Sequence, residues 1–153
     1  MRKATIDELI EKVLTGIERI GECDLVLTCS DGTLYRFWHE QKCCEYVRLE
    51  DICGDLDDLV GAPIVEAEEV SSPPPTMEDK KQHVYFTSPG YTSNDSYDWT
   101  FYRLSAKGTV TFRWLGESNG CYSERVEFDA IDENDVQHMR ETNQDMAAAP
   151  PDN

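Results

Sequence analysis

Two segments of alternating aromatic and β-branched residues constrain the fold of this chain more than any other feature. Residues 97–104 (YDWTFYRL) and 109–115 (TVTFRWL) are separated by a short connection that ends in glycine. A period of two is typical of strands buried on one face, and a connection of this kind predicts a hairpin. We therefore expect an antiparallel hairpin with Trp99, Phe101 and Arg103 on one face.

A second hairpin is predicted nearer the N-terminus. Residues 24–29 (DLVLTC) and 33–39 (TLYRFWH) flank Ser30-Asp31-Gly32, and Asp-Gly between two strand-like segments is a strong hairpin signal. Because side chains alternate along a strand, the second segment presents two sets on opposite faces. These sets are Leu34, Arg36 and Trp38, and Tyr35, Phe37 and His39.

The rest of the chain adds short elements around these hairpins. A capping box at Thr5-Ile-Asp-Glu8 predicts a short helix over 5–11. Acidic residues 51–59 predict a short helix or a loop. The expected strands are 12–20, 46–49, 64–70, an edge strand at 83–86, and 121–128, which would close a three-stranded meander after the 97–115 hairpin. The fold class is therefore α+β: a mostly antiparallel β-sheet with hairpins, a meander and one or two short helices.

The domain organisation follows from composition. Residues 1–128 are expected to form a single compact domain, interrupted by an exposed Pro-rich loop at about 71–82. Residues 129–153 contain a weak helical pattern at about 131–140 and end in an Ala- and Pro-containing acidic tail, which we expect to be disordered.

The formal net charge of −17 restricts the partners. Nucleic-acid backbones are bound by Lys and Arg, so we expect no direct nucleic-acid binding. No apolar segment approaches the roughly 20 residues that span a bilayer and no signal peptide is present, so the expected location is the cytoplasm, without membrane attachment. In that compartment the six cysteines (23, 29, 43, 44, 53 and 121) are expected to be thiols.

Part of the acidic charge is concentrated between Glu50 and Val70, where there are eight carboxylates and no Lys or Arg. A block of this kind is either a solvated face or a docking surface for a protein with a basic surface. The candidate partner-binding residues are Glu50, Asp51, Asp55, Asp57, Asp58, Glu66, Glu68 and Glu69. They lack the regular ligand spacing of a calcium loop, so we assign no metal to them.

A second candidate site is His39-x3-Cys43-Cys44-Glu45, with Cys53 further on. Imidazole and thiolates bind zinc, but adjacent cysteines are not the usual ligand spacing. A nucleophilic cysteine beside a histidine base is a further alternative. The plainer interpretation is one cysteine in the core and His39 at a strand end. We therefore expect no cofactor, with zinc retained as an alternative.

A third candidate is formed by the last strand of the 97–115 hairpin and the turn after it, where a guanidinium, an indole, a carboxylate, a hydroxyl, an amide and a phenol come close together in sequence. Such mixtures recognise small polar ligands, although core aromatics beside an Asn-Gly turn explain them equally well. With the previous site they form one candidate ligand pocket, composed of His39, Cys43, Cys44, Glu45, Arg113, Trp114, Glu117, Ser118, Asn119 and Tyr122.

These residues also carry a family resemblance over roughly residues 9–128. The His-x-x-x-Cys-Cys-Glu box, the segment DICGDLDDL and the late box RWLGESNGCYS resemble a family of small uncharacterised proteins found largely in bacteriophages, a domain of unknown function. Cys121 departs from this pattern, which has tyrosine at that position. The resemblance implies a phage accessory protein in the host cytoplasm, and it supplies no established activity.

The leading functional hypothesis is a non-enzymatic accessory protein that binds and inhibits a host defence or nucleic-acid-handling protein through an acidic, DNA-mimicking surface. The alternative is a small-ligand binding protein that sequesters a nucleotide-like signal. A zinc- or cysteine-dependent enzyme is the third hypothesis. The sequence does not decide whether the chain is an enzyme, and we prefer the non-enzymatic interpretation. It also leaves the oligomeric state open.

Overall fold

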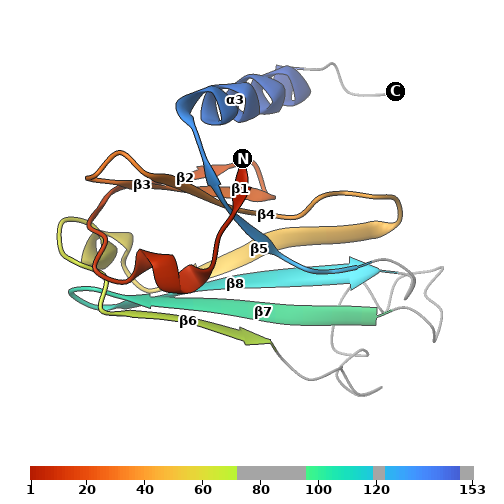
Figure 1. The fold of residues 1–153 in the computed structure, drawn as a ribbon. Coiled ribbons are helices and arrows are strands. Elements are labelled where there is room, and N and C mark those ends of the chain that lie inside the picture. The colour runs from red at the N-terminus through yellow and green to blue at the C-terminus, as the bar shows by residue number, and fades with distance from the viewer. Residues whose placement is uncertain (72–95, 119–122, 149–153) are drawn as a thin grey trace.

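The computed structural model describes residues 1–71, 96–118 and 123–148, and these residues form two antiparallel sheets packed face to face, with a helix outside them (Figure 1). The five-stranded sheet has the order β1 (Arg2–Lys3), β9 (Glu127–Ile131), β4 (Leu34–Trp38), β3 (Asp24–Cys29) and β2 (Leu14–Ile20). The four-stranded sheet has the order β5 (Glu45–Cys53), β8 (Thr109–Ser118), β7 (Ser96–Ser105) and β6 (Glu66–Ser71). The prediction of a mostly antiparallel β fold is confirmed.

The hairpin between β3 and β4 forms where Asp31 and Gly32 predicted it. The Thr33 amide donates to Asp31 Oδ1 at 2.9 Å, and Gly32 has φ +88°, a conformation that glycine adopts at little cost. The two faces of β4 also separate as expected. Tyr35 and Phe37 are buried between the sheets, whereas the Arg36 guanidinium lies over the Trp38 ring at 4.0 Å.

The hairpin predicted over residues 97–115 is confirmed and is longer than expected. β7 and β8 pair from Ser105↔Thr109 to Ser96↔Ser118. Its inward residues join the core between the two sheets, where the Phe37 ring lies 4.6 Å from both Tyr102 and Phe128. Aromatic side chains bury the largest areas in a core, so this cluster holds the two sheets together. The buried residues that β7 and β8 contribute to it are Tyr102, Leu104, Val110, Phe112 and Trp114.

The predicted three-stranded meander is wrong. The strand expected at 121–128 begins at Glu127 and pairs with β4 and β1 in the five-stranded sheet, through Phe37↔Phe128 and Arg2↔Ala130. The physical reason is that both edges of β8 are already filled, by β7 and by β5. β5 is the predicted strand 46–49 extended to Glu45–Cys53, and it pairs with β8 from Glu45↔Ser118 to Cys53↔Thr111.

The N-terminal helix is only one 3-10 turn, η1 (Ile6–Leu9), although the Thr5 amide donates to Glu8 as the capping box predicted. The acidic segment 51–59 becomes the end of β5 followed by η2 (Leu56–Leu59). The predicted strand 64–70 begins two residues later, as β6. The edge strand at 83–86, the Pro-rich loop after Ser71 and the tail after residue 148 lie outside the described residues.

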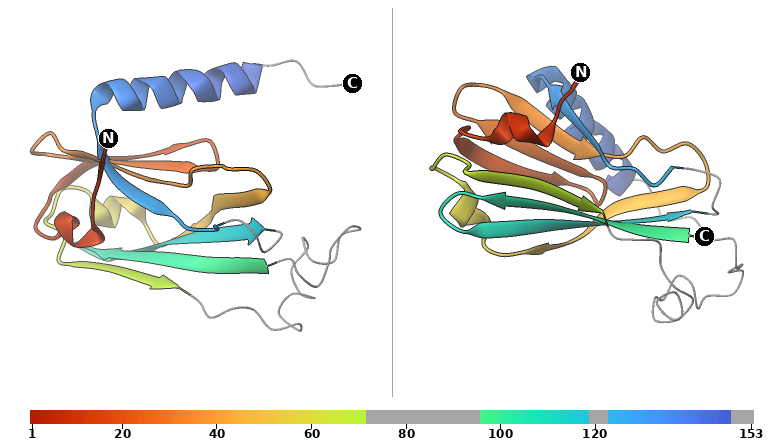
Figure 2. Two further views of the ribbon diagram at one scale, coloured as in Figure 1. Left: turned by 45° about the vertical axis from the view of Figure 1, so that its right-hand side comes forward. Right: turned by 60° about the horizontal axis from the view of Figure 1, so that its bottom comes forward.

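The C-terminal helix α3 (Glu133–Ala148) is longer than the pattern at 131–140 predicted, and it crosses the outer face of the five-stranded sheet (Figures 1 and 2). Val136 and Met139 are buried against Ile20, Val26 and Leu34. No described helix is long and apolar enough to cross a membrane.

Candidate functional site

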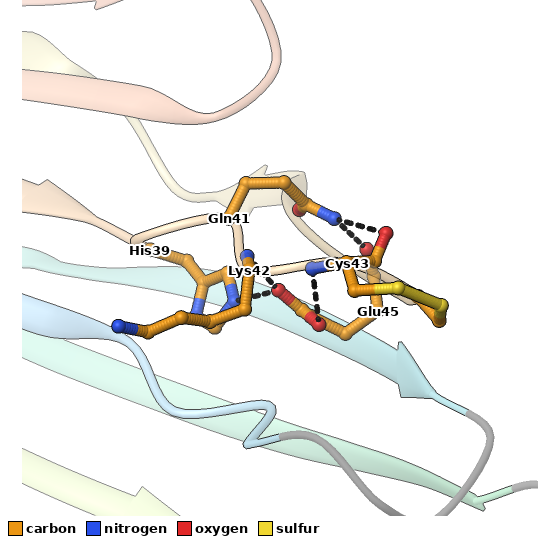
Figure 3. The surroundings of a disulfide bond; sticks show 6 residues. His39, Gln41, Lys42, Cys43 and Glu45 are labelled. Atoms are coloured by element: carbon orange, nitrogen blue, oxygen red, sulfur yellow. Dashed lines mark hydrogen bonds and ion pairs between the residues drawn. A yellow bond between two sulfur atoms is a disulfide. The ribbon is translucent and has the colours of Figure 1, made fainter.

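The His39–Glu45 box lies in the connection that leaves β4 in one sheet and enters β5 in the other. Figure 3 shows the carboxylate of Glu45 turned back into this connection, toward His39 and the backbone of Lys42 and Cys43. The side chain of Glu45 is fully buried, and that of His39 is 6% exposed. A buried carboxylate is costly unless donors surround it, so the local hydrogen bonds decide what this box does.

Three donors converge on Glu45. The Lys42 amide and the His39 ring nitrogen Nε2 (3.2 Å) reach Oε1, and the Cys43 amide reaches Oε2 at 3.4 Å. Burial of the Glu45 carboxyl acts to raise its pKa and is the largest single influence. The hydrogen bonds together outweigh burial, and the pKa of Glu45 is lowered from its usual value.

The His39 ring has an acceptor on each side. Nδ1 lies 2.7 Å from the Arg125 carbonyl oxygen and Nε2 lies 3.2 Å from Glu45 Oε1. The box is therefore a buried His39–Glu45 contact, and its histidine also links β4 to the segment before β9.

The expectation that all cysteines are thiols is wrong for one pair, because Cys43 and Cys44 form a disulfide. Both residues are exposed. The prediction rested on the expected cytoplasmic location, where disulfides are rare. The two cysteines lie in a bend just before β5. The zinc alternative needed a cysteine thiolate and the His39 ring as ligands. In this structure both sulfurs are in the disulfide, and both ring nitrogens of His39 contact protein oxygen atoms. Within the described ranges, no group of three His, Cys, Asp or Glu side chains is arranged to hold a metal.

Part of the late box does meet this connection. Glu45 pairs across the sheet with Ser118, and Tyr46 pairs with Glu117. Ser118 Oγ donates to Glu124 Oε1 at 2.7 Å in a buried contact. Glu124 was not singled out from the sequence, where nothing distinguishes it from the many exposed acids.

Other members of the predicted pocket are separated. Arg113 and Trp114 are neighbours on β8 and point to opposite faces of the sheet. Trp114 is fully buried in the core, and its indole nitrogen has no hydrogen-bond partner in the described part of the chain. Arg113 faces outward. Asn119 and Tyr122 lie outside the described residues. The single pocket drawn from these residues is therefore not formed as predicted.

Arg113 belongs to a row that crosses the outer face of the four-stranded sheet. The register places Val70 (β6), Phe101 (β7), Arg113 (β8) and Asp51 (β5) side by side. Arg113 Nη1 lies 3.1 Å from Asp51 Oδ2, and the guanidinium carbon lies 5.7 Å from the Phe101 ring centre. The same guanidinium carbon lies 4.8 Å from the ring centre of Trp99, which precedes Phe101 on the same face of β7. We call these five residues the outer row.

The outer row is partly accessible. Val70 is 39% exposed, and the side chains of Arg113 and Asp51 are 36% and 44% exposed. Trp99 and Phe101 are half-buried, and Trp99 packs against the buried Leu115. In the described ranges, α3 covers the other sheet and no helix covers this face (Figure 2). The sequence had placed Phe101 and Trp99 on one face correctly, but it did not connect them with Asp51 because that pairing joins strands far apart in the chain.

The predicted acidic block is divided among four places. Glu50 and Asp51 lie on the β5 edge of the four-stranded sheet, and Glu66 and Glu68 lie on its β6 edge. Glu69 turns to the opposite face, where it accepts a hydrogen bond from Tyr102 Oη at 3.3 Å. Asp55, Asp57 and Asp58 lie at η2, with Asp55 capping the Asp57 amide at 3.0 Å.

A cleft that the sequence did not reveal lies between α3 and the β2–β3 turn. Its volume is about 540 Å³, within the range of roughly 300–1,000 Å³ typical of ligand sites. Asp24 and Arg36 form an ion pair of 2.7 Å at this cleft, and burial, opposed by Arg36, raises the pKa of Asp24. Its lining also includes Ile20, Cys23, Tyr46, His138 and Met139. Sequence spacing gave no sign of this cleft, because its walls come from distant parts of the chain.

Comparison with known proteins bears on the domain and leaves its activity open. No curated protein and no solved structure matches the chain at a significant level. Residues 7–128 match DUF7448, a domain of unknown function. This range contains the His39–Glu45 box and nearly all of both sheets, and α3 lies beyond it. The chain therefore belongs to the DUF7448 family.

Proposed function

We propose that this chain is a non-enzymatic binding protein that uses the outer face of its four-stranded sheet to bind a protein with a basic surface. The observation that carries the proposal is the outer row. It combines the half-buried Trp99 and Phe101 and the exposed Val70 with a guanidinium on one sheet face. Trp and Arg are enriched among the residues that dominate binding energy, and a partly exposed apolar group on a sheet is a natural centre for an interface.

The charges around this centre support a basic partner. Acids stand on both edges of the same sheet: Glu50 and Asp51 on one side, Glu66 and Glu68 on the other. Three arginines are paired with these acids: Arg48 with Glu50 at 2.7 Å, Arg113 with Asp51 at 3.1 Å and Arg103 with Glu68 at 3.6 Å. The chain charge of −17 favours the approach of a cationic surface.

The biological setting that we propose is the one that the sequence suggested. The phage association rests on the resemblance described above, and small accessory phage proteins often blunt host defences. On this proposal the partner is a host defence or nucleic-acid-handling protein. The acidic edges occupy its basic nucleic-acid groove and inhibit it.

The proposal is tested with two variants of equal charge change. The edge variant combines E50Q, D51N, E66Q and E68Q, and the control combines D7N, E40Q, E133Q and E141Q, all exposed residues away from the outer row. Each purified protein is immobilised and exposed to host lysate, and captured proteins are identified and then titrated as pure components.

We expect a specific partner that binds wild type and the control variant but binds the edge variant at least roughly tenfold more weakly. Its affinity for wild type should fall as salt rises, because exposed charges are screened. Equal binding by both variants, or an affinity independent of salt, would refute the assignment of this face.

A second candidate function is supported by the cleft beside α3. Its volume and its half-buried Asp24–Arg36 pair suit a small ligand that combines an apolar part with a polar group. Native mass spectrometry of protein purified from its natural host tests this. A bound small molecule that is absent from a Met139→Trp variant, in which the indole fills the cleft, would support it. A bare chain mass in both proteins would remove it.

A further inference from the structure

We propose that Cys43–Cys44 is a reversible thiol–disulfide exchange site that reacts with low-molecular-weight thiols of the glutathione class. We further infer that its redox state controls how firmly the buried carboxylate of Glu45 is held. The proposal does not depend on the binding face, because it concerns the free protein. It assigns a chemistry to the His-x-x-x-Cys-Cys-Glu box, which the proposed function does not use.

Exposure and pairing together distinguish Cys43 and Cys44 from the other described cysteines. Cys43 and Cys44 are both exposed, so a small thiol can reach either sulfur. Cys29 is buried, and burial raises its pKa to about 11; burial also raises the pKa of the half-buried Cys23. Exchange proceeds through thiolates, so these two thiols are poor participants. Cys53 is exposed but is not part of a disulfide.

The exchange is a balanced two-electron reaction. A glutathione thiolate attacks one sulfur of the disulfide, the Cys43–Cys44 bond breaks, and a mixed disulfide and a cysteine thiolate form. A second glutathione thiolate attacks the glutathione sulfur of the mixed disulfide and releases glutathione disulfide and the other cysteine thiolate. Both thiolates take protons from solvent. The protein pair is reduced while two glutathione molecules are oxidised, and glutathione disulfide drives the reverse reaction.

The exchange is connected to Glu45 through the backbone. The amide of Cys43 is within the disulfide-bonded pair and donates to Glu45 Oε2 at 3.4 Å, and the Lys42 amide just before it donates to Oε1. Gln41 Nε2 donates to the Cys43 carbonyl oxygen at 3.3 Å (Figure 3). The disulfide limits the torsions of the Cys43–Cys44 unit. Once it is opened, these amides gain freedom, and the donors around Glu45 are held less firmly.

The chemical test uses the wild-type protein in buffers with a range of ratios of glutathione to glutathione disulfide. Samples are quenched with acid, alkylated and digested. The mass of the peptide that contains residues 43 and 44 is then measured by mass spectrometry. We expect the doubly alkylated form to replace the disulfide as glutathione increases, and to revert on return to glutathione disulfide. Two free thiols at every ratio, a disulfide unaffected by glutathione, or a lasting glutathione adduct would each overturn the proposal.

The structural consequence is read by amide hydrogen exchange over residues 42–45 in the two redox states. We expect at least a several-fold faster exchange in the reduced protein, and a smaller redox difference in Glu45→Gln, where the acceptor is already weakened. Cys53→Ser should behave as wild type. Equal exchange in the two states of wild type would separate the disulfide from Glu45 and overturn that part of the inference.

Discussion

Replacing Glu45 with glutamine tests whether the buried carboxylate stabilises the fold. Glutamine keeps the size of the side chain but offers one acceptor oxygen in place of two, so the amides of Lys42 and Cys43 and the His39 ring can no longer all be satisfied. A buried group left without its hydrogen-bond partner typically costs about 1–3 kcal/mol, and more where a charged group is involved. We therefore expect a loss of about 3 kcal/mol at pH 7.

The assay is urea unfolding followed by tryptophan fluorescence. With a slope of about 2 kcal/mol per molar urea, the midpoint should fall by about 1.5 M. Glu40→Gln, an exposed acid in the connection just before the same strand, is the control and should change the free energy of unfolding by less than about 0.5 kcal/mol. If Glu45→Gln shifts the midpoint no more than this control does, the buried pair does not have the assigned role.

The pH dependence gives an independent check of the same pair. The pKa of Glu45 is lower in the folded protein than its usual value, so the ionised form stabilises the fold. This contribution is present above the unfolded pKa of about 4.3 and is lost as pH falls through the lower folded value. The stability difference between wild type and Glu45→Gln should therefore shrink below about pH 4. A difference that grows on acidification would contradict this assignment.

Three further predictions concern the core, one turn and the helix. Phe37→Ala should lower the free energy of unfolding by about 3–5 kcal/mol in urea titrations, because the Phe37 ring lies between the sheets. Phe101→Ala, on the outer row, should cost far less. Equal losses would contradict the assigned faces. Gly54→Ala should cost more than about 2 kcal/mol, because φ is +121° and a new Cβ would lie 2.7 Å from the Thr109 carbonyl oxygen. Gly32→Ala, at φ +88° with open space around it, should cost only about 1 kcal/mol by the same assay, and the reverse order would refute this account. Met139→Asp should increase the rate of amide hydrogen exchange in α3 by at least about tenfold, because a carboxylate replaces the apolar contact with the sheet. The amides of β3 and β8 should stay protected. Unchanged exchange would show that this contact does not hold α3.

Local pattern was sufficient for the two hairpins and for the faces of their strands. Alternation over 33–39 correctly separated Phe37 from Trp38, and Asp31-Gly32 placed the turn, because a period of two and a glycine with positive φ are properties of a few consecutive residues. The mostly antiparallel class follows from the same signals. The clustering of His39, Cys43, Cys44 and Glu45 was also visible, since one short connection contains all four.

Only the tertiary structure decided which strands pair across long distances. β5 fills the second edge of β8, which moves β9 into the other sheet, and no local signal distinguishes this from the predicted meander, because many pairings satisfy the same alternation. The same applies to the sites. The His39 ring meets the Arg125 carbonyl 86 residues away, and Asp51 meets Arg113 62 residues away. Burial of Glu45, exposure of the outer row and the cleft beneath α3 arise from contacts between distant segments, which residue spacing alone does not encode.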